Sequence, residues 1–166
     1  MDSVLIEAFR YHKWANLYLL DVCAKLPKEE LHLTVPGTYG TIGAIFQHIA
    51  SGEEYYLMRL GAGDPTIRES DPFPGLAVLR EHLVQSTDRL FDMAGGIKGD
   101  ETFVWKDEHG MFTLAQRLVI VQALHHGNDH RTHVCTILGH HGIPFGEMDV
   151  WAYADATGAI DELTKA

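Results

Sequence analysis

Apolar residues recur every three to four positions in four long stretches of the chain, which is the spacing of amphipathic α-helices. The stretches cover about residues 3–26, 41–60, 75–93 and 114–141. Residues that interrupt helices follow the first three: Pro27, the segment GAGDP at residues 61–65, and AGG at residues 94–96. The pattern predicts an all-α fold, a four-helix bundle with the apolar stripes facing one core.

Both ends of the fourth predicted helix carry sequence signals. Thr113 and Gln116 form a T-x-x-Q pattern, which is typical of a capping box ahead of an apolar run. Gly142 and Pro144 fit the other end, because glycine adopts the left-handed conformation that closes a helix and proline does not continue one. A helix over residues 114–141 would run the whole length of a bundle.

The remaining segments look like connections. RESDPFPG, residues 68–75, is rich in turn-forming residues and predicts a surface connection. ETFVWKDEHGMFTL, residues 101–114, alternates around a glycine and predicts an extended arm or a short hairpin. The tail, residues 145–166, carries Trp151 and Tyr153, so we expect its first half to dock on the body. Length and even composition predict one domain over residues 1–166.

Charge and cysteine content exclude some classes of function. The chain has 23 acidic and 13 basic residues, a formal net charge of −10, and no cluster of Lys and Arg that nucleic-acid binding requires. Charged residues between positions 7 and 13 break the first apolar run, which predicts neither a signal peptide nor a membrane span. Cys23 and Cys135 are too few for a disulfide framework and predict free thiols in a reducing, cytoplasmic protein.

Histidine is concentrated near the end of the predicted fourth helix. Six of the eleven histidines lie in LHHGNDHRTHVCTILGHHG, residues 124–142. At 3.6 residues per turn, His126 and His130 fall on the apolar stripe, and this i, i+4 spacing brings two imidazoles close enough to share one metal ion. His125 and Asp129 form a second pair rotated by about 100°, so the apolar stripe favours the first pair. Two inward histidines would also fit an ordinary core that satisfies them with hydrogen bonds.

A third metal ligand must come from another helix, and the spacing of residues does not select one. His12, His48 and His82 all lie on predicted helices near apolar residues. Glu53 and Glu54 would either orient the ligand imidazoles or face solvent. These alternatives stay open on periodicity alone.

Three stretches of the chain resemble, in order, the DinB-like superfamily of metalloenzymes, which includes bacillithiol-transferase-like members. They are FRYHKWAN, GTIGAIFQHIASGEEYYLMRLGAG and LVIVQALHHGNDHRTHVCTILGHHG, within residues 9–142. The resemblance implies a four-helix bundle, commonly a homodimer, with a long crossover between the second and third helices. GAGDPTIRESDPFPG, residues 61–75, lies where that crossover should be.

The same resemblance implies one divalent metal held by three histidines, one on the second helix and an H-x-x-x-H pair on the last long helix. Carried over by motif, these are His48, His126 and His130, so the resemblance selects His48 over His12 and His82. His133 stands where the family commonly has glutamine. It would tune the site, accept a hydrogen bond from a substrate, or have no part in the site.

Three neutral imidazoles leave a metal ion with an open position, which is the catalytic arrangement. Zinc or nickel is expected, and imidazole also suits iron and copper. Related families include thiol-dependent transferases and a mycothiol-dependent maleylpyruvate isomerase. The resemblance therefore implies a metal-dependent thiol transferase or hydrolase acting on a small molecule, such as a low-molecular-weight thiol. A non-catalytic, stress-associated metal-binding module and histidines that stabilise a dimer are the alternatives.

Overall fold

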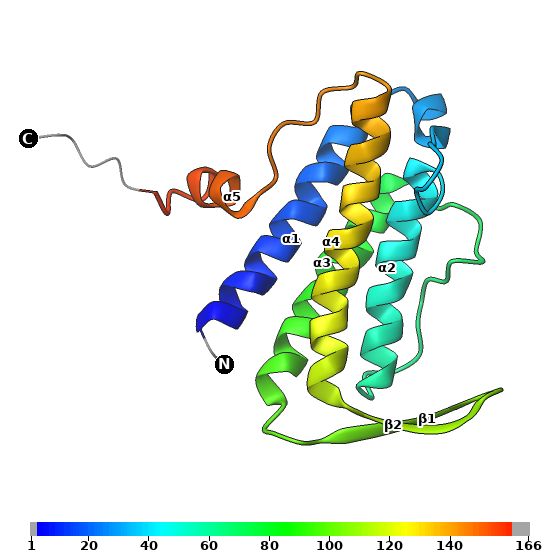
Figure 1. The fold of residues 1–166 in the computed structure, drawn as a ribbon, viewed down its shortest axis with the longest axis vertical. Coiled ribbons are helices and arrows are strands. Elements are labelled where there is room, and N and C mark those ends of the chain that lie inside the picture. Colours follow the sequence, from blue (N-terminus) through cyan, green and yellow to red (C-terminus); the bar gives the residue numbers. More distant parts are fainter. Residues whose placement is uncertain (1–2, 161–166) are drawn as a thin grey trace, which may run out of the picture.

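The structure, a computed structural model that describes residues 3–160, has four long helices lying side by side (Figure 1). Shorter elements cover their ends. In chain order the elements are α1 (Ser3–Cys23), a 3-10 helix (Lys28–His32), α2 (Ile42–Arg59), α3 (Leu76–Gly96), β1 (Thr102–Asp107), β2 (Gly110–Ala115), α4 (Gln116–His140) and α5 (Val150–Ala156). The four predicted helices are therefore confirmed, with shifts of a few residues at their ends. Within the described range, none of the helices combines the length and apolar character that a membrane span requires.

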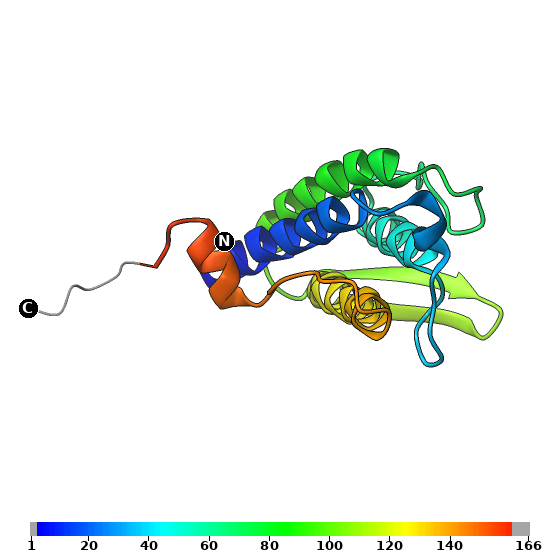
Figure 2. The same cartoon turned by 90° about the horizontal axis from the view of Figure 1, so that it is seen from above.

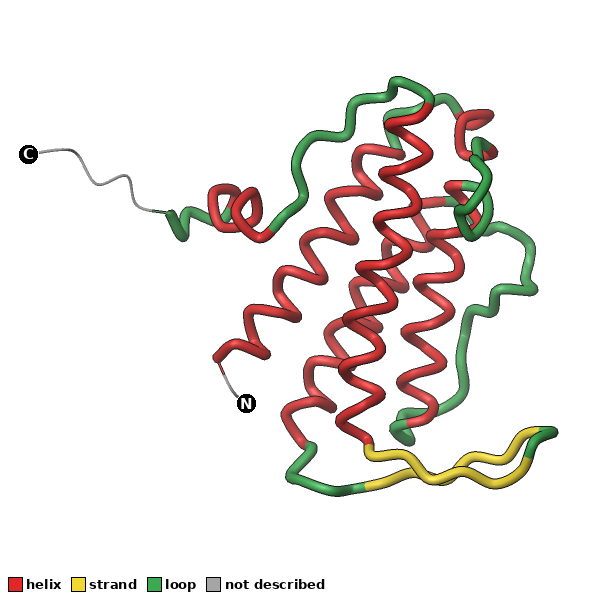
Figure 3. The backbone as a smooth tube through the Cα atoms, in the orientation of Figure 1, coloured by secondary structure: helices red, strands yellow, loops and turns green. Residues whose placement is uncertain are grey.

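The expectation of an all-α fold needs a correction, because the fold is mostly helical with a small antiparallel sheet (Figure 3). Strands β1 and β2 pair from Thr102 opposite Ala115 to Asp107 opposite Gly110. The hairpin alternative for residues 101–114 is thus confirmed. The aromatic rings of Phe103, Trp105 and Phe112 stack along it, with centroid distances of 5.5 and 5.0 Å. This aromatic packing stabilises a two-stranded ribbon that would be marginal alone.

The hairpin also explains why the predicted capping box is wrong. Thr113 lies in β2 opposite Val104, so its backbone belongs to the strand pairing and not to a helix terminus. Helix α4 begins at Gln116, and no side chain caps it. Instead, the Gln116 backbone N–H donates to the Glu101 carbonyl at 2.8 Å. The local signal was overridden by pairing with the preceding strand.

Helices α1 and α2 each pack against both α3 and α4 (Figure 2). Helices α1 and α4 run in one direction, and α2 and α3 run in the other (Figure 1). Two consecutive parallel helices require a connection that returns along their length, and residues 60–75 make this crossover beside α2. The crossover therefore lies against the outer face of α2, where it meets the candidate site.

The core consists of two apolar clusters, counted over the part of the chain that the structure describes. One includes Leu19, Phe46 and Leu83, and the other includes Phe9 and Leu57. Between them, at mid-length of the helices, lies a layer of buried polar side chains contributed by all four long helices: His12, Asn16, Glu53, Ser86, Thr87 and Arg131. The candidate site lies on α2 and α4 at about this level of the fold.

The first half of the tail contacts α1. The Tyr11 hydroxyl donates to the Met148 carbonyl at 2.8 Å, and the Tyr18 hydroxyl donates to the Phe145 carbonyl at 3.0 Å. Asp149 caps α5 by accepting from the Ala152 backbone N–H at 2.8 Å. Residues 161–166, which the predicted tail includes, lie outside the described residues.

Candidate metal centre

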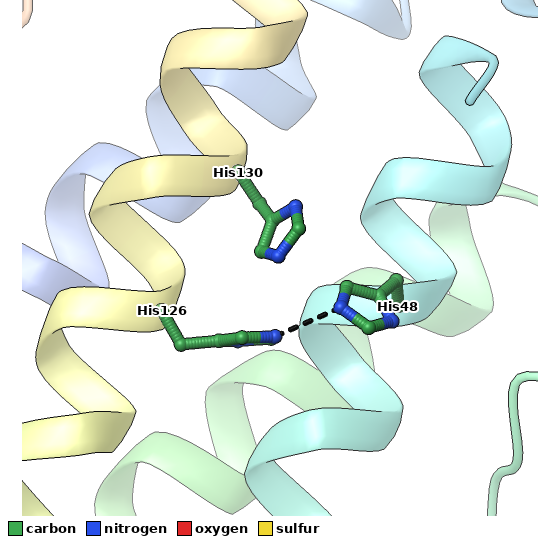
Figure 4. Close-up of side chains that lie close together, drawn as sticks. All are labelled: His48, His126 and His130. Atoms are coloured by element: carbon green, nitrogen blue, oxygen red, sulfur yellow. Dashed lines mark hydrogen bonds between the residues drawn. The ribbon is translucent and has the colours of Figure 1, made fainter. Parts of the chain in front are cut away.

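Three histidines from two antiparallel helices converge (Figure 4). His48 comes from α2, and His126 and His130 come from successive turns of α4. The Nε2 atoms of His48 and His126 are 2.9 Å apart, and the His130 ring centroid lies 4.4 Å from each of the other two. One ring nitrogen of each residue lies within 4.8 Å of the other two, close enough for a single ion to reach all three. We refer to these residues as the histidine cluster.

Helical phase and a glycine together position the cluster. His126 and His130 share their face of α4 with Ala123 and Val134, which are fully buried. Gly52 lies one turn after His48 on α2, and a Cβ atom built there would be 2.7 Å from His126 Cε1. A side chain at this position would therefore displace the imidazole. The glycine permits the close approach of α2 and α4 that brings the three rings together.

The imidazoles of His126 and His130 are neutral at physiological pH. Burial, and secondarily the neighbouring imidazoles, lower the pKa of His126 to about 3 and that of His130 to about 4. Neutral imidazole is the form that binds transition metals, because a lone pair is available on the ring. The Nδ1 atoms of both residues are buried and have no hydrogen-bond partner in the described chain. Buried polar atoms are normally satisfied, so these two nitrogens are exceptional. The three-imidazole donor set itself fits a divalent transition metal.

Glu69 on the crossover orients His48. Its Oε2 atom lies 2.9 Å from His48 Nδ1, so a carboxylate here accepts the Nδ1 hydrogen and leaves the Nε2 lone pair facing the cluster. Tyr39 donates to the other carboxylate oxygen, and its ring stacks on His48 with centroids 3.9 Å apart. Burial raises the pKa of Glu69, but the hydrogen bonds from Tyr39 and His48 outweigh it and hold this pKa below its usual value. No sequence pattern pointed to Glu69 as a partner of the histidines.

The crossover is held against α2 on both sides of Glu69. The Gln47 side chain is buried, and its Nε2 donates to the carbonyls of Arg68 at 3.0 Å and Asp71 at 2.8 Å. Directly before Arg68, Ile67 is buried in the core, and its backbone N–H donates to Glu54 at 3.2 Å. These anchors fix the backbone that carries Glu69, so its carboxylate is presented to His48 by the fold.

The structure places the other candidate ligands elsewhere. His12 Nε2 lies 2.8 Å from Glu53, and His82 Nδ1 lies 2.7 Å from Glu54. Each of these histidines is thus paired with a buried carboxylate and is not part of the cluster. Glu53 and Glu54 have relative exposures of 1% and 7%, so the alternative that they face solvent is wrong. Their carboxylates hold His12 and His82, whereas Glu69 holds the clustered histidine.

Two further histidines of α4, His125 and His133, differ in their surroundings. His125 is exposed, and its Nδ1 lies 3.2 Å from Asp129, as helical phase predicts for the outward pair. His133 is partly buried, its ring centroid lies 5.3 Å from that of His130, and its Nδ1 is also unpaired within the described chain. It lies beside the cluster and outside the group of three.

Both cysteines are free thiols, as predicted. Burial raises the pKa of Cys23 to about 12 and that of Cys135 to about 11. A thiol with such a pKa is almost fully protonated at neutral pH, and the thiolate is the nucleophile. Neither residue therefore competes with the histidine cluster as the reactive centre.

A cavity of about 230 Å³ lies beside the cluster. Its lining comes from α2, α4 and the crossover: His48, Ser51, Gly52, Tyr55, Tyr56, Arg59, Glu69 and His126. Larger cavities of about 500 and 470 Å³ lie near Cys23 and beneath α5, but none of the three clustered histidines lines them. The smaller cavity is the one where a ligand could meet the imidazoles.

Comparisons with known proteins identify a family and a shared fold. The model of the DinB family matches residues 1–163. The crystal structure of a DinB-like protein from Bacillus cereus ATCC 10987 superposes with a TM-score of 0.61 at 15% sequence identity, covering 86% of this chain and 94% of that one. At this identity the likeness shows a shared fold. The comparison with curated proteins gives no significant match.

Proposed function

Because the chain belongs to the DinB family, we propose that it is a single-domain four-helix bundle that binds one divalent metal through His48, His126 and His130 and acts as an enzyme on a small molecule. The convergence of three ring nitrogens within 4.8 Å of one another carries this proposal. Zinc or nickel is the preferred ion, and iron also suits the ligand set. The family resemblance supports a homodimer as the working form.

The chain's own groups have distinct parts in this proposal. The three imidazoles bind the ion, and Glu69 keeps the Nε2 lone pair of His48 directed toward it. A transition metal held by three neutral histidines supplies Lewis acidity, which activates a carbonyl or a bound thiol. The adjacent cavity admits a small substrate to this position. The reaction class is a thiol transfer or a hydrolysis.

The cavity supports an enzyme over a non-catalytic, stress-associated module. A site that only stores or senses a metal, or that only joins two subunits, has no need of space beside the ligands. Here the cavity wall includes two of the three histidines and two tyrosines, Tyr55 and Tyr56. A catalytic metal site requires such an open position, whereas a structural site is closed by a fourth protein ligand.

Elemental analysis tests the metal site directly. Untagged purified protein is expected to contain about one equivalent of a transition metal, and the His126→Ala variant is expected to lose it because two ligands hold an ion weakly. The absence of metal from the natural chain, even after zinc or nickel is added, would refute the proposal. A variant that keeps a full equivalent would show that the ion binds elsewhere.

Glu69 is expected to affect metal affinity without touching the ion. The Glu69→Ala variant removes the acceptor for His48 Nδ1, so the dissociation constant for zinc should rise about 10–100-fold. A zinc titration in competition with a chromophoric chelator measures this change. Glu81→Ala is the matched control, because Glu81 is an exposed carboxylate on α3. Equal zinc affinity in the Glu69→Ala variant and the control would contradict the orienting part assigned to Glu69.

A further inference from the structure

The cavity beside the histidine cluster extends along one face of α2 to a cationic side chain. His48, Gly52, Tyr55 and Arg59 follow one another at spacings of four, three and four residues, which places them on a single helical stripe. All of them line the cavity. The stripe leads from a candidate metal ligand at one end to the Arg59 guanidinium at the other.

Arg59 is held in place by the hairpin. Its guanidinium carbon lies 5.2 Å from the centroid of the Trp105 ring, a cation–π contact. Trp105 is itself fixed between the rings of Phe103 and Phe112. The side chain is partly buried, and no described carboxylate lies within ion-pair distance of it. The guanidinium is therefore pre-positioned, and its N–H donors are not committed to an acidic partner.

The charge of the cavity lining favours an anion. Its one described carboxylate, Glu69, already accepts hydrogen bonds from His48 and Tyr39. Arg59 is the one cationic lining residue within the described chain, in a protein whose formal net charge is −10. A divalent ion on the histidines would add to this local positive charge. An arginine isolated in an acidic protein next to a cavity is a natural partner for a carboxylate.

We propose that this cavity selects small anionic substrates, with Arg59 binding a carboxylate at one end while the reacting group meets the histidine cluster at the other. The proposal names the substrate class of the proposed metal site and rests on that function. Arg59 is a specificity-determining residue in this arrangement. Its contact with Trp105 connects the hairpin to substrate recognition.

The geometry also limits the length of the substrate. Gly52 lies against His126, and Arg59 follows it by seven residues, a rise of about 10 Å along the helix axis. An arginine side chain in a helix leans toward the N-terminus, which shortens the distance to be bridged. The cavity beside the cluster has a volume of about 230 Å³. The acidic group and the reacting group are therefore expected to be separated by a chain of several bonds.

Two probes of equal length test this inference with cobalt-loaded protein. ω-Mercaptohexanoate and ω-mercaptohexanol share a thiol that ligates cobalt. At the other end of the chain the first carries a carboxylate and the second a hydroxyl. The change in the cobalt absorption spectrum on thiolate binding gives both dissociation constants. The natural chain should bind the acid about tenfold more tightly, as one charge-assisted contact of this kind predicts. Arg59→Gln should bind both probes equally, and Arg59→Lys should keep part of the preference.

Arg80→Gln is the matched control, because it makes the same change in net charge on α3, where Arg80 pairs with Asp21 outside this cavity. It should keep the full preference for the acid. Equal binding of the two probes by the natural chain, or an unchanged preference in Arg59→Gln, would overturn the anion site alone. Failure to take up cobalt would overturn the proposed metal site. Cobalt uptake by each variant also confirms that the variant is folded.

Discussion

Zinc is expected to raise the thermal unfolding midpoint of the metal-free protein by about 5–10 °C, and the His130→Ala variant is expected to lose this rise. An ion that binds only the folded chain stabilises it by about 2.7 kcal/mol when present at a hundred times its dissociation constant. In a chain of this size, each kcal/mol shifts the midpoint by about 2–4 °C. Differential scanning calorimetry with and without zinc measures the shift.

His125→Ala provides the control for this experiment. His125 immediately precedes His126, but its side chain is 69% exposed and pairs with Asp129 on the outer face of α4. The two variants thus remove the same chemical group from the same helix, and only one removes a member of the cluster. His125→Ala should keep the full zinc-induced rise. A rise of equal size in His130→Ala, or none in the natural chain, would show that the cluster does not bind zinc.

Local periodicity was sufficient to identify the inward histidines of α4. The apolar stripe favoured His126 and His130 over His125 and Asp129 as the inward pair. In the structure His126 and His130 are partly buried and converge with His48, whereas the side chains of the other pair are exposed. This works because the faces of a straight helix are set by its 3.6-residue period alone. The start of α4 was less predictable, since strand pairing in the hairpin displaced the local capping signal of Thr113.

The partners of the cluster depend on contacts that no periodicity describes. His12, His48 and His82 all lie on helices, and each pairs with a different glutamate. His12 pairs with Glu53 and His82 with Glu54, both on α2. His48 pairs with Glu69 on the crossover. The spacing of residues along one helix does not say which carboxylate a histidine meets across the fold. The resemblance to a known family selected His48, and the three-dimensional structure shows how its surroundings differ from those of His12 and His82.

Glu69 and Arg59 were missed for related reasons. The crossover has no helical or strand period. Its path depends on two residues of α2: Gln47, which donates hydrogen bonds to its backbone carbonyls, and Glu54, which accepts one from a backbone N–H. Arg59 is the last residue of α2, and no sequence pattern connects it with Trp105 of the hairpin, which the fold places against it. In both cases an irregular segment folds back on α2 and completes the wall of the site. Loops positioned by a rigid scaffold often carry function in this way.

The second large effect is expected in the buried polar layer. Glu53 is 1% exposed and accepts hydrogen bonds from Ser86 at 2.5 Å, Thr87 at 2.9 Å and Asn16 at 3.3 Å, while His12 Nε2 lies at 2.8 Å. One carboxylate therefore joins side chains from three helices. A buried charge is tolerated only when it is compensated and fully hydrogen-bonded.

Arg131 supplies the compensating charge. It is 3% exposed, and its Nη1 donates to Asn16 Oδ1 at 2.7 Å and lies 3.3 Å from His12 Nδ1, so His12 and Asn16 bridge the guanidinium and the carboxylate. Burial lowers the pKa of Arg131, with smaller opposing effects from Tyr11 and Glu53. Removal of Glu53 would leave this buried cation without its counter-charge.

Glu53→Ala is therefore expected to lower the free energy of unfolding by about 3–5 kcal/mol, measured by urea denaturation of the metal-free protein. Glu53→Gln should lower the free energy of unfolding by less, because it keeps the volume and an acceptor oxygen while it removes the charge. It allows the measurement if the alanine variant does not fold.

Glu81→Ala on the exposed face of α3 is the control, and its free energy of unfolding should stay within about 0.5 kcal/mol of that of the natural chain. A loss below about 1 kcal/mol in both Glu53 variants would contradict the network. A chelator added to all samples removes any bound metal. A large decrease would therefore show that the polar layer itself stabilises the bundle on which the three histidines lie.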